Sequence, residues 1–167
     1  FQMKILQYLF ISLSHKILKI LPYRLIRLLS VPIGTLYFLL TFRSSIKLFK
    51  RKKIFETLKI NYKPLIVEIN YTRYWLETLW LTNKNFSKHI TPHVEIENQE
   101  YVDKLKKQYP GLIFALPHLG NWEFAIPVGN SIKLNLLAVA EPLSNSYVLN
   151  WFKSCLLYTS DAADEKV

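Results

Sequence analysis

The sequence predicts an α/β fold: a mostly parallel β-sheet flanked by helices, preceded by N-terminal amphipathic helices and incomplete at the C-terminus. Residues 112–116, Leu-Ile-Phe-Ala-Leu, form a continuous apolar run, as expected of a strand that is covered on both faces. Residues 134–140 form a second apolar run, which predicts a neighbouring buried strand. Helical segments join these predicted strands through short connections, an order that is typical of a parallel sheet.

Length and composition narrow the class of protein. The chain has 167 residues, which suits one domain or part of a larger one. Half of the residues are apolar, which excludes a disordered chain. A single cysteine, Cys155, excludes a disulfide framework and a Cys-rich zinc module.

The excess positive charge lies in residues 1–59, which hold twelve Lys and Arg residues and one acid, Glu56. The apolar residues between these charges recur at spacings of three and four, as on one face of a helix. Basic side chains that border a wide apolar face favour a helix lying in an anionic membrane surface. Residues 3–60 are therefore assigned as a basic amphipathic membrane-associating helical segment.

Other interpretations of this segment stay open. Its longest uncharged run, Leu28–Phe42, is shorter than the ~20 apolar residues that a spanning helix needs. An interfacial or shallowly inserted hairpin fits that length, and a single span remains an alternative if flanking basic side chains snorkel. An ordinary core helix with a solvated basic face is a further alternative. Nucleic acid fits worse, because the basic residues alternate with Leu, Ile and Phe.

The elements follow from breakers and caps along the chain. The helices expected in the first half are Lys4–Lys19, Tyr23–Lys47 with a kink or turn at Pro32–Gly34, Leu48–Ile60 and Pro64–Leu81. In the second half we expect a strand at Thr91–Glu97, a helix Gln99–Gln108 capped by Asn98, a helix from Asn121, and a helix capped by Ser144 that runs to Ser154.

The most informative stretch is Pro-His-Leu-Gly-Asn-Trp-Glu at residues 117–123, directly after the first predicted buried strand. Ligands of open α/β sheets bind at the carboxyl ends of strands, where His118 is expected. Gly120 lets the backbone pass close to a bound group, and Asn121 can cap the next helix. Glu123 then falls in the first turn, where its carboxylate can orient His118 as a general base.

Spacing alone leaves a structural role for His118 open. Four histidines and 12 acids in 167 residues give about 0.3 chance matches to His-x-x-x-x-Glu. A capped, structural histidine is therefore an equal alternative on the residues alone. Glu141 ends the second predicted strand and would face the same crevice, but a carboxylate preceding a helix is an alternative role. The chain lacks a Gly-x-Ser-x-Gly nucleophile elbow and a His-Glu-x-x-His zinc pair, so these residues favour base-assisted attack by a substrate hydroxyl.

The motif at residues 117–123 resembles that of the bacterial lipid A biosynthesis acyltransferase family, the late acyltransferases, which also includes phosphatidylinositol mannoside acyltransferases. The runs at 138–143 and 151–153 are closer to the mannoside branch. The resemblance implies that His118 is the base, that Glu123 is its acid, and that Glu141 helps to position the histidine. It further implies that residues 61–154 are the N-terminal part of an acyltransferase α/β domain.

The function expected from this resemblance is membrane-associated O-acyl transfer from an acyl thioester to a glycolipid hydroxyl, with phosphatidylinositol mannoside favoured. The expected partners are membrane lipids, the glycolipid acceptor, and acyl-CoA or an acyl-carrier protein as donor, with no nucleic acid, metal or organic cofactor. Backbone donors near Gly120 and Asn121 would hold the oxyanion. The expected location is the cytoplasmic face of the bacterial plasma membrane, peripheral or shallowly inserted. A lipid A precursor acyltransferase and a non-enzymatic peripheral membrane protein are the alternatives.

The last residues do not fit the rest of the chain. Residues 155–165, Cys-Leu-Leu-Tyr-Thr-Ser-Asp-Ala-Ala-Asp-Glu, look like a translated transposon adaptor from sequencing-library preparation. Residues 155–167 are therefore interpreted as a non-native tail, and the natural protein is expected to continue beyond Ser154. On this interpretation Cys155 is not a biological thiol.

Overall fold

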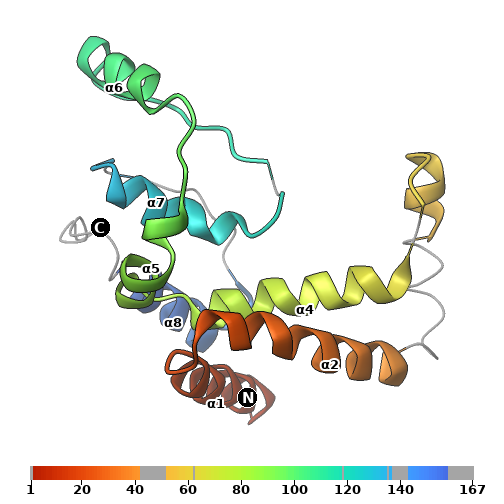
Figure 1. Cartoon of the computed structure of the whole chain (residues 1–167). Helices are drawn as coiled ribbons and strands as arrows, with labels where there is room; N and C mark the ends of the chain where they lie inside the picture. Colours follow the sequence, from red (N-terminus) through yellow and green to blue (C-terminus); the bar gives the residue numbers. More distant parts are fainter. Residues whose placement is uncertain are drawn as a thin grey trace. The chain divides into compact units, whose positions relative to one another are not determined.

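The computed structural model describes residues 2–41, 52–61, 63–117, 119–134, 136 and 143–157. The chain divides into two compact units, Phe1–Trp80 and Leu81–Val167. In the first unit the helices are α1 Gln2–Leu18, α2 Tyr23–Thr41 and α4 Pro64–Trp80, and residues 52–57 are also helical (Figure 1). In the second unit the elements are α5 Asn83–His89, the 3₁₀ helix η1 Thr91–His93, α6 Gln99–Gln108, the 3₁₀ helix η2 Trp122–Phe124, α7 Ala125–Ser131 and α8 Ser146–Leu157.

The prediction of a parallel sheet is wrong, because the described ranges contain helices and no strand. Residues 112–116, the first predicted strand, lie outside helix and strand. The side chain of Ile113 is fully exposed and that of Leu116 is 58% exposed. An apolar run becomes a buried strand only where a neighbour takes its backbone hydrogen bonds and other elements cover both faces. Within the described residues, 112–116 have neither a pairing strand nor elements that cover both faces. Most of the second predicted strand, 134–140, lies outside the described residues.

The strand expected at Thr91–Glu97 is also wrong, since the segment begins as η1. The alternation of apolar and polar residues there was outweighed by Pro92, which sits at the start of the 3₁₀ turn. Proline has no N–H for a strand ladder and its fixed φ suits the first turn of a helix. The N–H of His93 donates to the Ile90 carbonyl at 2.8 Å, which closes the turn.

Helices α2 and α4 pack side by side and antiparallel in the first unit (Figure 1). The face of α2 toward α4 is formed by Ile26, Ser30 and Gly34, which recur every four residues and are all buried. At Gly34 a Cβ atom would lie 2.7 Å from the Cα of Ile69, so only glycine permits this close approach of the two backbones. The small residues of α2 therefore set the distance between these helices.

Polar contacts hold α1 and the start of α2 against the end of α4. His15 Nδ1 lies 2.6 Å from the carbonyl oxygen of Leu79. The indole N–H of the fully buried Trp80 donates to the Leu21 carbonyl at 2.9 Å. These bonds fix the turn between α1 and α2, where the sequence predicted a break near Pro22.

Helix α2 continues through Pro32, where the sequence predicted a kink or turn. Pro32 lies on the exposed side of α2, so the missing N–H does not disturb the face that packs against α4. Two residues earlier, the buried Ser30 hydroxyl donates to the Arg27 carbonyl at 2.6 Å, so this polar group has a partner inside the packed face. The predicted helices at α1, α4 and α6 are confirmed, with ends shifted by up to two residues.

The caps in the second unit differ from those predicted. Asn98 precedes α6 in a left-handed conformation, φ 57°, and its side chain makes no capping bond. Before α8 the cap is Asn145, whose Oδ1 accepts from the Tyr147 N–H at 3.1 Å, one residue beyond the predicted Ser144. At the end of α7 the ammonium group of Lys106 donates to the carbonyls of Ile132 and Lys133, at 3.3 and 3.2 Å.

Candidate active site

The described residues at the start of the predicted motif, 117, 119 and 120, are exposed and lie outside helix and strand. Leu119 is 77% exposed, and its N–H donates to the Pro117 carbonyl at 2.8 Å. Gly120 follows with φ +62°, a left-handed conformation that strains any residue with a side chain. No atom lies within 4 Å of the position a Cβ would take at Gly120. The glycine is therefore required here by the turn of the backbone rather than by crowding.

Asn121 organises the turn that follows. Its side-chain Oδ1 accepts a hydrogen bond from the Glu123 N–H at 3.2 Å, and its carbonyl accepts from the Phe124 N–H at 3.3 Å. This is the capping role predicted for Asn121. Because the Glu123 N–H donates to the Asn121 Oδ1, this hydrogen bond holds the turn without needing a ligand.

Glu123 lies in the first turn, as predicted, and is only 6% exposed. A buried carboxylate is unusual, since burying a charge without polar partners is costly. Among the described residues of the motif, 117 and 119–123, Glu123 is the only buried one. A solvated surface acid would show no such burial.

An aromatic contact anchors the turn to the rest of the second unit. The ring of Phe124 packs against Phe86 of α5, with centroids 5.9 Å apart and planes tilted by 53°. Phe86 is 2% exposed and belongs to the core of this unit. Phe86 therefore helps to hold the residue that follows Glu123.

Helix α5 was not predicted from the sequence, where residues 82–90 were assigned to no element. The Thr82 hydroxyl oxygen accepts from the Asn85 N–H at 3.1 Å, an ordinary N-cap. Thr82, followed by Asn83, was the signal that could have located this helix. Its length of seven residues gives too few turns for a periodic apolar pattern to stand out.

Two of the predicted catalytic residues, His118 and Glu141, lie outside the described residues. Within the described part of the chain, Gly120, Asn121 and Glu123 are brought together in one turn. No three His, Cys, Asp or Glu side chains there are grouped so that they could hold a metal ion.

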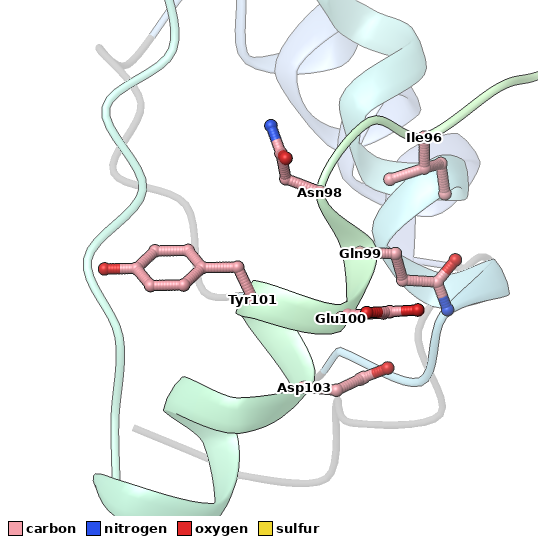
Figure 2. Close-up of a pocket in the computed structure, with 6 residues that line it drawn as sticks. All are labelled: Ile96, Asn98, Gln99, Glu100, Tyr101 and Asp103. Atoms are coloured by element: carbon pink, nitrogen blue, oxygen red, sulfur yellow. The ribbon is translucent and has the colours of Figure 1, made fainter.

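A shallow hollow lies at the N-terminal end of α6, with a volume of about 630 Å³ (Figure 2). It is lined by Ile96, Asn98, Gln99, Glu100, Tyr101 and Asp103. None of the predicted site residues lines it, and its two carboxylates would repel the anionic groups of an acyl-CoA or a phospholipid. It does not serve the chemistry predicted for the motif.

A family model described as "Bacterial lipid A biosynthesis acyltransferase" matches residues 2–154, which is most of the chain and includes the turn at 120–123. No curated protein and no solved structure gives a significant match.

Proposed function

Because the chain belongs to the bacterial lipid A biosynthesis acyltransferase family, whose members are acyltransferases acting on lipids, we propose that it is a membrane-associated O-acyltransferase. The proposed reaction moves a fatty acyl chain from an acyl thioester to a hydroxyl of a glycolipid. The observation that supports it best is the buried Glu123 in a turn capped by Asn121, five residues after His118. That spacing is the one through which an acid can orient a histidine base in this motif.

In the proposed mechanism His118 takes the proton from the acceptor hydroxyl as its oxygen attacks the thioester carbonyl. Backbone N–H groups near Gly120 and Asn121 stabilise the tetrahedral oxyanion. The intermediate then expels the thiolate, which receives the proton held by His118. No covalent bond to the enzyme forms, and no metal or organic cofactor takes part in this proposal.

Glu123 would stabilise the imidazolium that forms on His118. Its burial supports this role, because a carboxylate interacts more strongly with a nearby cation where water is excluded. Glu141 is the proposed second acid that positions the histidine, on the basis of the family resemblance of its sequence context.

Two acceptor lipids fit the proposal. The family description names lipid A, which favours a lipid A precursor. The sequence at 138–143 and 151–153 favours phosphatidylinositol mannoside instead. Both are membrane glycolipids with free hydroxyl groups, so the base mechanism is the same. We retain the mannoside as the proposed acceptor and the lipid A precursor as the alternative.

The family is membrane-associated in bacteria. For this chain we propose the cytoplasmic face of the plasma membrane, where acyl-CoA and acyl-carrier protein are available. An enzyme docked there meets its amphiphilic acceptor by diffusion within the membrane plane. Each Lys or Arg close to an anionic surface contributes about 1 kcal/mol to such docking.

The decisive experiment measures acyl transfer by the His118→Ala variant in membranes, with each glycolipid offered in turn and with acyl-CoA or acyl-carrier protein as donor. Loss of a general base lowers the rate by about 10²–10⁴-fold. Glu123→Gln, which keeps the side-chain shape but removes the charge, is expected to lower it in the same direction.

His93→Ala is the matched control, because His93 is exposed and has no acid five residues later. It should transfer acyl groups at the unaltered rate. Undiminished turnover by the His118→Ala variant would refute the proposed base, and transfer to neither glycolipid would refute the proposed acceptors.

A further inference from the structure

The short helix α7 directly continues the turn that carries Glu123. Glu123 lies in η2, and α7 begins at Ala125, the residue that follows η2. The seven residues of α7 are too few for a helix that is stable by itself, so its direction depends on contacts with the rest of the second unit. Whatever holds α7 therefore also restricts the position of the Glu123 carboxylate.

The start of α7 is held by the aromatic contact of Phe124 with the buried Phe86. A contact at one end leaves a short helix free to tilt about that point. Seven helical residues span about 10 Å, so the far end of α7 lies beyond the reach of this ring contact. The contacts at the C-terminal end of α7 thus decide whether the helix and the turn keep one orientation.

The C-terminal end of α7 closes in a Schellman motif. The Leu134 N–H donates to the Gly129 carbonyl at 2.9 Å. The Lys133 N–H donates to the Asn130 carbonyl at 3.0 Å. The motif needs a left-handed residue, which here is Lys133 with φ 59°. Glycine usually takes that position, because the left-handed conformation is unfavourable for a residue with a Cβ atom. The bonds of this cap are complete, but its sequence makes it weaker than a glycine cap.

A side chain of α6 supports this cap. The Lys106 ammonium group donates to the carbonyl oxygens of Ile132 and Lys133, at 3.3 and 3.2 Å. Ile132 is the C-cap residue of α7, and the last carbonyls of a helix have no N–H partner within it. A cation here also interacts favourably with the negative end of the helix dipole. Lys106 thus supplies both hydrogen-bond donors and a positive charge to this end of α7.

A packing contact holds the same end of α7. Gly129 is buried, and a Cβ atom at this position would run into the side chain of Leu136. Leu136 therefore folds back onto the last turn of the helix, as apolar residues after a Schellman motif often do. Apolar contacts have no preferred direction, whereas hydrogen bonds have one. The two bonds of Lys106 are therefore better suited than Leu136 to fix the orientation of α7.

We propose that Lys106 is a positioning residue for acyl transfer. It holds the C-terminal end of α7 and, through α7 and η2, the Glu123 carboxylate. The inference rests on the proposed function, in which Glu123 orients His118 as the base. Lys106 acts through α7 and not by contact with the substrate. The proposal gives α6, which lies outside the motif, a part in the reaction.

The first test needs no turnover and uses hydrogen exchange of the whole chain. Lys106→Met keeps the length of the side chain but removes its charge and its donors. Exchange of the η2 and α7 amides should become about 2–10-fold faster in this variant. Lys107→Met is the matched control, because Lys107 is the next residue of α6 and is also exposed. It should exchange like the wild type, and wild-type rates in the Lys106→Met variant would overturn the proposal.

The second test measures acyl transfer in membranes, with the glycolipid and the donor that the wild type accepts. Lys106→Met should lower kcat at least about threefold. KM should not change, because Glu123 stabilises a charge that forms on His118 only as the reaction proceeds. Lys106→Arg keeps a charged donor and should restore most of kcat, and Lys107→Met should equal the wild type. An unchanged kcat in the Lys106→Met variant would contradict the positioning role.

A double-mutant cycle with Glu123→Gln separates this inference from the proposed function. If Lys106 acts through Glu123, Lys106→Met should cause no further loss of kcat in the Glu123→Gln background. An equal loss in both backgrounds would show that Lys106 acts on another part of the enzyme and would overturn the proposal. Full turnover by the Glu123→Gln single variant would refute the role of Glu123 in the proposed function, and the positioning role of Lys106 with it.

Discussion

The hydroxyl of Tyr23 donates a hydrogen bond to Oε1 of Glu77 at 3.0 Å, joining the start of α2 to the end of α4. The Tyr23 ring also packs against Trp80, with centroids 5.2 Å apart. Together with the bond from Trp80 to Leu21, this contact fixes the antiparallel alignment of the two helices. A buried carboxylate is satisfied by a neutral donor, which makes the contact sensitive to the ionisation of Tyr23.

The first prediction concerns pH. Burial, followed by the charge of Glu77, raises the pKa of Tyr23 from 10.0 to about 12. The folded state therefore keeps a proton that the unfolded state loses, and the stability of the first unit should fall as pH rises from 10.0 to about 12. Urea unfolding at a series of pH values measures this slope. The slope should be smaller in the Tyr23→Phe variant, and an unchanged slope would contradict the prediction.

The second prediction concerns the contact between α2 and α4. Ala in place of Gly stabilises a helix interior by about 0.5–1 kcal/mol. At Gly34 the added Cβ would meet the backbone of Ile69, and overpacking costs about 1–3 kcal/mol. Gly34→Ala should therefore lower the free energy of unfolding, as measured by urea denaturation.

Gly111→Ala is the control for Gly34→Ala, because no atom lies within 4 Å of a Cβ at Gly111 and its φ is not positive. It should leave the unfolding midpoint nearly unchanged. A Gly34→Ala variant that is more stable than the Gly111→Ala variant would contradict the close approach of α2 and α4.

The third prediction concerns the turn before Glu123. Asn121→Ala removes the oxygen that accepts from the Glu123 N–H, and loss of an N-cap costs about 1 kcal/mol. Acyl transfer should fall as well, because the position of Glu123 is less restricted. Asn121→Ser, which can cap in the same way, should restore much of the loss in kcat/KM. Equal activity of the Ala and Ser variants would show that the cap does not position Glu123.

The fourth prediction concerns the aromatic anchor. Phe86→Ala removes a buried ring that packs on Phe124 and should cost about 3–5 kcal/mol in the second unit. Hydrogen exchange of the η2 and α7 amides should become faster. Tyr101→Ala removes an exposed ring from the same unit and should change stability by less than about 0.5 kcal/mol. Unaltered exchange in the Phe86→Ala variant would argue against the anchor.

The sequence located the helices that have a long periodic pattern or a proline at their start. Pro64 opens α4, and the apolar spacing of residues 4–19 gave α1 within two residues at each end. It also predicted Asn121 as a cap and Glu123 in the turn that follows, because the two residues are only two positions apart and bond to each other locally. These features depend on local bonds, which the order of the residues specifies directly.

Features that depend on distant partners could not be predicted in this way. The apolar run at 112–116 was interpreted as a buried strand, yet Ile113 is fully exposed, because burial requires neighbours elsewhere in the chain. The need for glycine at Gly34 and the bond from Tyr23 to Glu77 arise only when α2 meets α4. The sequence by itself thus determined the helices α1, α4 and α6, the charge of the chain and the order of the motif, since these follow from local bonds and periodicity. The tertiary structure decided which apolar faces are covered, because burial is a property of contacts between segments.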